Sequence, residues 1–269
     1  MTRLTRLAAI SDVHGNLPAL DAVLADIAAQ RVDVIVNLGD ILSGPLWAAD
    51  TADRLMMLDL PTIAGNHERQ LLTRSRDHMS ASDAHTHDEL LPRHRAWLAS
   101  LPPTLALSDE VFCCHGTPAS DLVYFLETTV TGFAGVGRGA NGVRAATLAE
   151  ATERAGTTQS HIAHGLILCG HTHVPRMLRL ADGRLIVNPG SVGLQGFDDD
   201  HVHPHVIETG APHARYALLE RSAAGWHVTL RAVVYDWDSA ARRADREGRP
   251  DWAHALRSGF VGPLERDIE

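Results

Sequence analysis

The sequence predicts an α/β fold organised around a parallel β-sheet. Three apolar runs, at residues 4–10, 32–38 and 60–64, have the length of buried strands. Segments with helical spacing of apolar side chains separate these runs. Strands that alternate with helices favour parallel pairing through right-handed crossovers, so the first 68 residues predict a β-α-β-α-β unit.

The first helix is expected directly after the first strand. Asn16 is suited to cap this helix, and Pro18 is suited to its first turn. Its apolar face recurs at helical spacing through Leu17, Leu20, Val23, Leu24 and Ile27. A second helix is expected around residues 48–58. The polar segment 70–101 predicts further helix, with Pro92 near the start of one of its helices.

The second half of the chain predicts more strands than helices. Residues 117–164 are expected to hold helical stretches and a glycine-rich loop at 132–142. A charged helix is expected at residues 238–248. Asp182-Gly183 predicts a tight hairpin turn. The predicted strands are residues 104–107, 111–114, 166–169, 177–180, 185–187, 214–220 and 226–235.

Composition is that of an ordinary globular protein. Of 269 residues, 45% are hydrophobic and 21% are charged, and no linker or repeat divides them, so we expect a single domain over residues 1–269. No apolar run is long enough for a membrane span, and the first residues lack a signal-peptide core. The net charge of -9 argues against non-specific nucleic-acid binding. The oligomeric state is open.

The cysteines indicate a reducing compartment. Cys113, Cys114 and Cys169 are an odd number and lie in apolar, strand-like runs. This pattern argues against a disulfide framework and predicts a cytoplasmic protein with its thiols in the core.

Polar residues follow the predicted strands at five places. The carboxyl ends of strands in an open α/β sheet are where sites gather. Side chains at i and i+2 of an extended chain point to one side, so Asp12 with His14, and His171 with His173, can converge. The five pieces are Asp12-x-His14, Gly39-Asp40, Gly65-Asn66-His67-Glu68, His115-Gly116 and Gly170-His171-Thr172-His173.

These side chains form a plausible ligand set for metal ions. They offer carboxylate, amide oxygen and imidazole, with no thiolate. Such donors suit Mn, Fe, Co, Ni or Zn better than a pure Ca or Mg cage. Such a ligand set predicts a site for divalent transition metal, with manganese first among the candidates.

The ordered set resembles the calcineurin-like metallophosphoesterase superfamily, whose pattern is D-x-H, G-D, G-N-H-[DE], H and G-H-x-H. The closing Asn-Pro-Gly-Ser-Val-Gly at residues 188–193 is similar to the small bacterial phosphodiesterase and phosphatase branch. The resemblance implies a four-layer α/β/β/α sandwich with mixed sheets and a site for two divalent transition-metal ions. It assigns ligands by position: Asp12, His14 and His173 to one metal, Asn66, His115 and His171 to the other, and Asp40 to both.

The resemblance also implies roles beside the metals. His67 would act as the catalytic group that protonates the leaving oxygen or stabilises charge on the phosphoryl group. Glu68 would orient His67 or serve as a helix-start carboxylate. Asn16 corresponds to a position near substrate, although a helix cap explains it equally well.

The implied reaction is hydrolysis of a phosphodiester or a small phosphomonoester, the substrate being a small phosphorylated molecule such as a nucleotide. Two ions ~3.5–4 Å apart clamp the reacting oxygens, and a metal-bridging hydroxide attacks phosphorus in line. A dinucleoside polyphosphate hydrolase and a protein Ser/Thr phosphatase are alternatives within the superfamily. The latter carries an Arg soon after G-D, which residues 40–45 lack; Arg69 or Arg138 would have to replace it. A metal-binding scaffold without activity is the non-enzyme alternative.

Several other features have simpler interpretations. His85-Thr86-His87 repeats the spacing of residues 171–173 but lies in a polar segment, so we expect it to be solvated. The three histidines after the acidic run 198–200 are expected in an exposed insertion: His201, His203 and His205. The G-x-G-x-x-G at 137–142 lacks a strand–helix frame and is expected as a loop at the rim of the site. Trp47 and Phe197 either stack a nucleobase or pack in the core.

Overall fold

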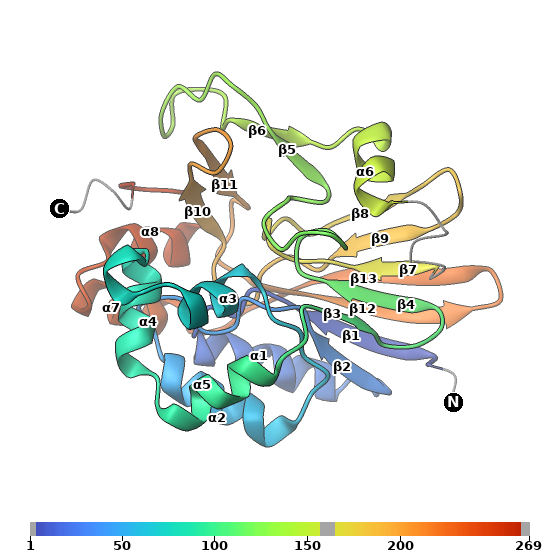
Figure 1. Cartoon of the computed structure of the whole chain (residues 1–269), viewed down its shortest axis with the longest axis horizontal. Coiled ribbons are helices and arrows are strands. Elements are labelled where there is room, and N and C mark those ends of the chain that lie inside the picture. The colour runs from blue at the N-terminus through green and yellow to red at the C-terminus, as the bar shows by residue number, and fades with distance from the viewer. Residues whose placement is uncertain (1–3, 157–164, 265–269) are drawn as a thin grey trace.

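The computed structural model describes residues 4–156 and 165–264 of the chain. Four strands form the first sheet: β1 (Arg6–Ile10), β2 (Val34–Asn37), β12 (Ala214–Ser222) and β13 (Gly225–Val233). Their order is β13-β12-β1-β2 (Figure 1). β1 and β2 are parallel, as the β-α-β pattern predicts, whereas β12 is antiparallel to β1.

A second sheet of five strands lies against the first. It contains β3 (Thr104–Ala106), β4 (Val111–Cys114), β7 (Leu166–Leu168), β8 (Arg176–Arg179) and β9 (Leu185–Asn188). Their order is β3-β4-β7-β9-β8, with β4, β7 and β9 parallel. Two hairpins stand apart: β5 (Glu127–Thr129) with β6 (Val143–Ala145), and β10 (Gly196–Asp199) with β11 (His205–Glu208).

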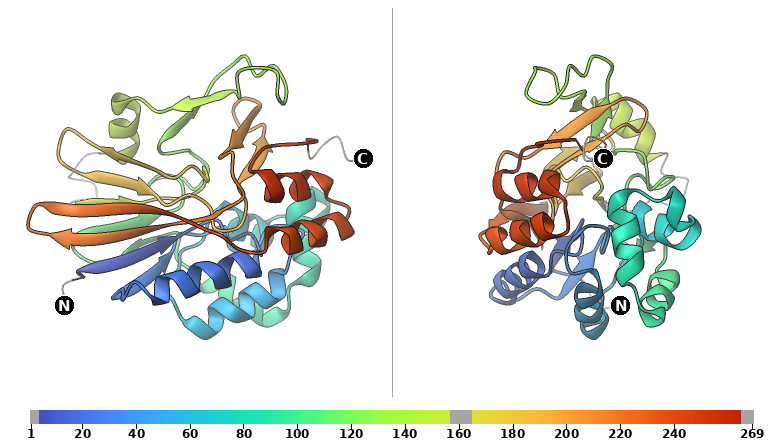
Figure 2. Two further views of the ribbon diagram at one scale, coloured as in Figure 1. Left: turned by 180° about the vertical axis from the view of Figure 1, so that it is seen from behind. Right: turned by 90° about the vertical axis from the view of Figure 1, so that its left-hand side faces the viewer.

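Helices cover the outer faces of the two sheets. They are α1 (Leu17–Ala28), α2 (Ala48–Leu58), α3 (Asn66–Thr73), α4 (Ala81–Glu89), α5 (Pro92–Ser100), α6 (Leu148–Ala155), α7 (Trp237–Arg246) and α8 (Pro250–Ser258), with a 3₁₀ turn at Arg76–His78. Figure 2 shows α1 and α2 on one outer side and α6 on the other. Asn16 caps α1 as predicted, since its side chain accepts a hydrogen bond from the amide of Ala19.

Three apolar clusters define the layers. Leu7 and Val36 of the first sheet meet Leu168 of the second in a cluster between the sheets. The opposite face of the first sheet packs on α1, α2, α7 and α8. The outer face of the second sheet packs on α6, where Ile167 contacts the cluster that includes Ala151. The predicted four-layer α/β/β/α arrangement with mixed sheets is therefore confirmed.

Some local predictions were wrong. Residues 60–64 form no strand: only Thr62 bridges Asn37, because the chain then turns away and the Ala64 amide donates to Pro102. The described part of 117–164 holds one helix, α6, and the β5–β6 hairpin. Helix α8 and the β10–β11 hairpin were not predicted, although Pro250 at the first turn of α8 is a helix-start signal.

The three cysteines are free and buried, as expected for core residues. Within the described residues, no helix combines the length and the apolar character that a membrane span needs.

Candidate metal centre and active site

Strand ends from both sheets converge on one region. Asp12 follows β1, Asp40 follows β2, His115 directly follows β4, and His171 lies just beyond β7. The loops are tied together, since the Asp12 amide donates to the Gly39 carbonyl at 2.9 Å and the Asp12 carboxylate accepts from the His171 amide at 3.2 Å. The carboxyl edges of the two sheets therefore bring together side chains that lie far apart in the sequence.

Five of the candidate ligands have an uncommon backbone conformation. Non-glycine residues rarely adopt positive φ, and those that do concentrate at functional sites. Eight described non-glycine residues have positive φ. Five of the eight are candidate ligands: Asp12 at 55°, His14 at 51°, Asp40 at 53°, His171 at 69° and His173 at 57°. The loops thus hold left-handed turns that aim these side chains inward.

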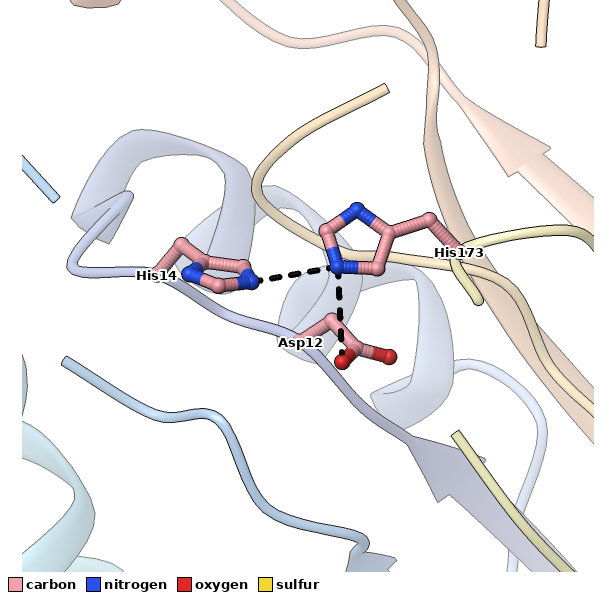
Figure 3. Close-up of side chains that lie close together, drawn as sticks. All are labelled: Asp12, His14 and His173. Carbon is pink, nitrogen blue, oxygen red and sulfur yellow. Dashed lines mark hydrogen bonds and ion pairs between the residues drawn. The ribbon is translucent and has the colours of Figure 1, made fainter. Parts of the chain in front are cut away.

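The first group of candidate ligands consists of Asp12, His14 and His173. One potential ligand atom from each lies within 4.8 Å of the others. The Nε2 atoms of His14 and His173 are 3.1 Å apart, and His173 Nε2 is 3.5 Å from Asp12 Oδ1 (Figure 3). All three residues are buried. This is a compact cluster of two nitrogens and a carboxylate.

The imidazoles are oriented by backbone carbonyls. His14, His115 and His173 each donate Nδ1–H to a carbonyl oxygen, at 2.7, 2.8 and 2.8 Å. In the neutral form of each ring the lone pair is therefore on Nε2, as in metal-ligating histidines. Burial and the neighbouring His173 lower the pKa of His14 to about 3, so this ring is neutral and able to bind a cation at neutral pH.

A second group comprises Asp40, His115 and His171. His115 Nε2 lies 2.9 Å from Asp40 Oδ2, yet it makes no hydrogen bond of acceptable geometry. Despite burial, His115 and His67 hold the pKa of Asp40 well below its usual range, so the carboxylate is charged. Burial and His115 lower the pKa of His171 to about 4.

Asn66 lines the same cavity as Asp40 and His171. Its Oδ1 atom is buried and has no hydrogen-bond partner among the described residues. An orphaned buried amide oxygen is costly unless a ligand satisfies it. Among the candidate ligand atoms of the described residues, Asn66 Oδ1 and His115 Nε2 are buried without a hydrogen-bond partner, and a bound cation would satisfy both. The donor set, oxygen and imidazole nitrogen without thiolate, fits divalent transition metals.

His67 lies next to Asn66 on α3 but points elsewhere. Its Nδ1 donates to Asp83 Oδ1 of α4 at 2.8 Å, and its amide donates to Asp40 Oδ1 at 3.0 Å. Burial opposes protonation of the ring, but Asp40 and Asp83 raise the pKa of His67 to about 10 in the metal-free protein. His67 thus lies beside the candidate metal ligands with its Nδ1 bonded to Asp83.

Glu68 does not orient His67, contrary to one of its two predicted roles. Neighbouring positions on a helix do not face each other. The buried Glu68 carboxylate instead accepts from the amides of Asp40, Ile41 and Gly65, at 2.9, 2.8 and 2.8 Å. It therefore joins the loop after β2 to the start of α3. A Cβ at Gly65 would overlap the Asp40 carboxylate, so this close approach needs glycine.

A cavity of about 830 Å³ opens over these residues. Six predicted site residues line it: His14, Asp40, Asn66, His67, His171 and His173. Asp12 and His115 do not line it and are almost completely buried. The cavity is large enough for a substrate that extends well beyond one phosphoryl group.

Asn16, one of the predicted substrate-binding positions, does not line the cavity. Its amide nitrogen donates to the Gly193 carbonyl at 2.8 Å and to the Tyr235 hydroxyl at 3.2 Å, and its oxygen caps α1. Both ends of the amide are used within the fold. The structure therefore gives Asn16 a role in holding the loop after Ser191 against α1.

The prediction that His85 and His87 are solvated was wrong. Neither histidine lines the cavity. Both are half-buried, because α4 packs on α2 and Thr86 between them is buried. His85 lies 3.4 Å from Glu89, and His87 lies 3.5 Å from Asp88. Their position gives them a packing role.

The predicted exposed insertion after Gly196 is the β10–β11 hairpin, and part of it lines the cavity. His201 and the acidic residues 198–200 are among the lining residues. His205 is buried and shares a 2.9 Å hydrogen bond with the Tyr124 hydroxyl, so the prediction of exposure was wrong for this residue. Phe197 also lines the cavity, with its ring 4.5 Å from that of His173.

Other predicted rim features lie away from the cavity. No described residue of the 132–142 loop lines it, and Trp47 packs against the helical core instead. Neither arginine considered as a phosphate ligand lines it. Arg69 is engaged in a bidentate pair with Asp121, at 2.7 and 2.9 Å, and Arg138 lies in the glycine-rich loop.

Sequence reasoning missed two contributors to the site. Asp83 is an ordinary helix residue in the sequence, and only its contact with His67 distinguishes it. The segment around α8 supplies Arg249 and Trp252 to the cavity lining, and Arg249 is paired with Asp251 at 2.6 Å. The pattern Arg-Pro-Asp at the start of α8 was a usable helix signal, but it carried no hint of the site.

The model of the calcineurin-like phosphoesterase superfamily domain matches residues 5–210, which include every strand-end motif of the site. The chain belongs to this superfamily. A crystal structure of a metallophosphoesterase from Sphaerobacter thermophilus is 26% identical, with a TM-score of 0.69; the match covers 96% of this chain and 100% of that chain. An uncharacterized protein from Methanocaldococcus jannaschii is 22% identical over 259 residues, 91% of this chain and 94% of its own length.

Membership identifies this calcineurin-like phosphoesterase as a hydrolase of phosphoesters. The family match ends at residue 210, so β12, β13, α7 and α8 lie beyond it. The Sphaerobacter structure extends over this C-terminal part as well, because it covers nearly all of the chain.

Proposed function

We propose that this phosphoesterase depends on two metal ions and hydrolyses phosphodiesters or small phosphomonoesters by in-line attack on phosphorus. One observation carries the proposal: two buried triads, Asp12–His14–His173 and Asp40–His115–His171, lie side by side at the base of the cavity. The hydrogen bond from the His171 amide to Asp12 joins the two triads.

The proposed ligand roles follow the two groups. Asp12, His14 and His173 would hold one ion. Asn66, His115 and His171 would hold the other, with Asp40 shared between them. The ions would supply Lewis acidity to the phosphoryl oxygens and lower the pKa of the attacking water.

His67 would donate a proton to the leaving oxygen. It lines the cavity, and Asp83 fixes its Nδ1, so the Nε2–H of a protonated ring is the atom available to substrate. The His67 ring would be protonated before the step and neutral after it, and solvent would then return a proton to the ring.

Small phosphoesters fit better than the two alternatives within the superfamily. A protein Ser/Thr phosphatase would need an arginine after Asp40, and neither Arg69 nor Arg138 lines the cavity as a replacement. The longer polyphosphate chain of a dinucleoside polyphosphate would meet the carboxylates of residues 198–200 in the same lining, which repel its charges.

We infer further properties from the same residues. Manganese is the first candidate metal, with Fe, Zn, Co and Ni as alternatives for oxygen and imidazole donors. Residues 1–269 would act as one domain, because the cavity lining runs from His14 to Pro263. The buried free thiols support a reducing, cytoplasmic location.

Metal content and turnover test the proposal. Protein loaded with Mn²⁺ should carry two ions per chain by elemental analysis and should hydrolyse bis(p-nitrophenyl) phosphate. Asp40→Ala should lose both metal and turnover, whereas Asp50→Ala, an exposed residue of α2, should lose neither. Fewer than two ions together with no hydrolysis of this diester would establish the scaffold alternative instead.

A further inference from the structure

One face of α3 leads away from the candidate metal centre. His67 and Gln70 on the helix, and Arg74 directly after its last turn, all line the cavity. Their spacing of three and four residues places them on a single helix face. At about 1.5 Å per residue, Arg74 lies roughly 10 Å further along than His67.

Gln70 has unused hydrogen-bonding capacity. Gln70 as a whole residue is 7% exposed, and its side-chain amide makes no hydrogen bond to another described residue. Its amide atoms are not among the buried side-chain atoms that lack a partner, so they are accessible from the cavity. Because Gln70 lines the cavity, a molecule bound there can supply the missing partner.

Arg74 has unused charge. The cavity lining contains two arginines, Arg74 and Arg249. Arg249 is paired with Asp251 and also donates to Ser82 at 2.9 Å. Arg74, in contrast, makes no ion pair or side-chain hydrogen bond with any residue that the structure describes.

The charges of the cavity favour the α3 side for an anion. The part of the lining that β10 and the following turn contribute carries three carboxylates, at residues 198–200. These disfavour negative charge, whereas the guanidinium of Arg74 favours it and offers several donors to a phosphate. A substrate with a second anionic group would therefore be oriented with that group toward α3.

We propose that Gln70 and Arg74 form a subsite for a second phosphate group of the substrate, beyond the phosphoryl group that is cleaved. This rests on the proposed function, because the metal centre would hold the first phosphoryl group. The subsite would select phosphorylated alcohols that carry a further phosphate. Neither residue belongs to the strand-end motifs, so they determine specificity and do not take part in the chemical step.

Phosphonates provide a test because they have no ester bond to cleave. The dissociation constants of butylphosphonate and butane-1,4-bisphosphonate would be measured by titration calorimetry on the Mn²⁺-loaded full chain. The ratio of the two dissociation constants measures the contribution of the second phosphonate group. We expect the wild type to bind the bisphosphonate about tenfold more tightly, since a charge-assisted hydrogen bond contributes on that scale.

Three variants assign the effect. Arg74→Ala and Gln70→Glu should bring the ratio close to one, the latter by placing a carboxylate where an anion binds. Arg76→Ala removes a nearby arginine that is paired with Asp88 outside the cavity lining, and it should keep the wild-type ratio.

The outcomes separate the two proposals. An Arg74→Ala ratio equal to the wild-type ratio, or no preference in the wild type, overturns the subsite. Fewer than two bound ions together with no hydrolysis of bis(p-nitrophenyl) phosphate overturns the proposed function, and the calorimetric ratio still decides the subsite because it needs no turnover.

Discussion

His67 and Asp83 are joined by a 2.8 Å hydrogen bond between Nδ1 and Oδ1, across the contact between α3 and α4. Asp83 itself is completely buried. The pair resembles in form the carboxylate–imidazole arrangement in which a buried acid fixes the tautomer and orientation of a catalytic histidine. Because Asp83 occupies Nδ1, Nε2 is the ring nitrogen of His67 left for a molecule in the cavity.

Asp83→Asn should lower kcat while leaving metal content unchanged, because the amide keeps the shape of the side chain and loses the charge that holds the His67 tautomer. We expect a loss of about ten- to a hundredfold, part of what a general acid contributes. Asp88→Asn, an exposed position on the same helix, is the matched control. If kcat of Asp83→Asn matched that of the control, Asp83 would have a purely structural role.

His67→Gln should retain both metal ions and lose turnover in a manner that depends on the leaving group. A p-nitrophenolate ion leaves without protonation, whereas an alkoxide needs the proton. We expect a loss of about 10²–10⁴-fold for an alkyl phosphodiester and a much smaller loss for bis(p-nitrophenyl) phosphate. Equal losses for both substrates would contradict a proton-donor role and indicate charge stabilisation.

Gly65→Ala should disturb the metal centre although it replaces none of the proposed ligands. The new Cβ would overlap the Asp40 carboxylate and come within 2.7 Å of the Asp40 amide nitrogen, so the loop after β2 must shift. We expect weaker binding of at least one ion, measured by metal titration, and a lower unfolding temperature. Gly165→Ala is the control, because a Cβ there meets nothing within 4 Å. Normal metal affinity in Gly65→Ala would show that this close approach is dispensable.

The metal-free protein should lose stability as the pH falls from about 6.5 to about 4. His14 and His171 have folded pKa values lowered to about 3 and about 4, so the unfolded chain binds protons in this range that the folded chain does not. Each contributes up to about 1.4 kcal/mol per pH unit. Urea unfolding of chelator-treated protein at pH 7 and pH 5 measures the change, and His14→Gln should reduce it. The pKa values of His67 and His115 are raised to about 10 and about 9, so their contribution to stability is lost only as the pH rises above about 6.5. An unchanged midpoint between pH 7 and pH 5 would mean that these rings are not buried as neutral groups.

Local pattern was sufficient for the order of the main elements and for the composition of the candidate site. β1, α1 and β2 follow directly from runs of apolar residues and their spacing. The strand-end positions of Asp12, Asp40, His115 and His171 were predicted because a parallel sheet collects the carboxyl ends of its strands at one edge. The missing third strand shows the limit of such patterns: residues 60–64 are apolar, but their pairing depends on where the chain goes next.

The sequence by itself determined which residue types stand at the strand ends, and hence the family and the class of chemistry. The tertiary structure decided which distant partners complete the site. His67 is bonded to the carboxylate of Asp83 and not to that of the adjacent Glu68. Both ends of the Asn16 amide are bonded within the fold. The β10–β11 hairpin and α8 contribute residues to the cavity lining. These outcomes depend on contacts between elements, whereas hydrophobic period and capping signals report only on neighbours within a few residues.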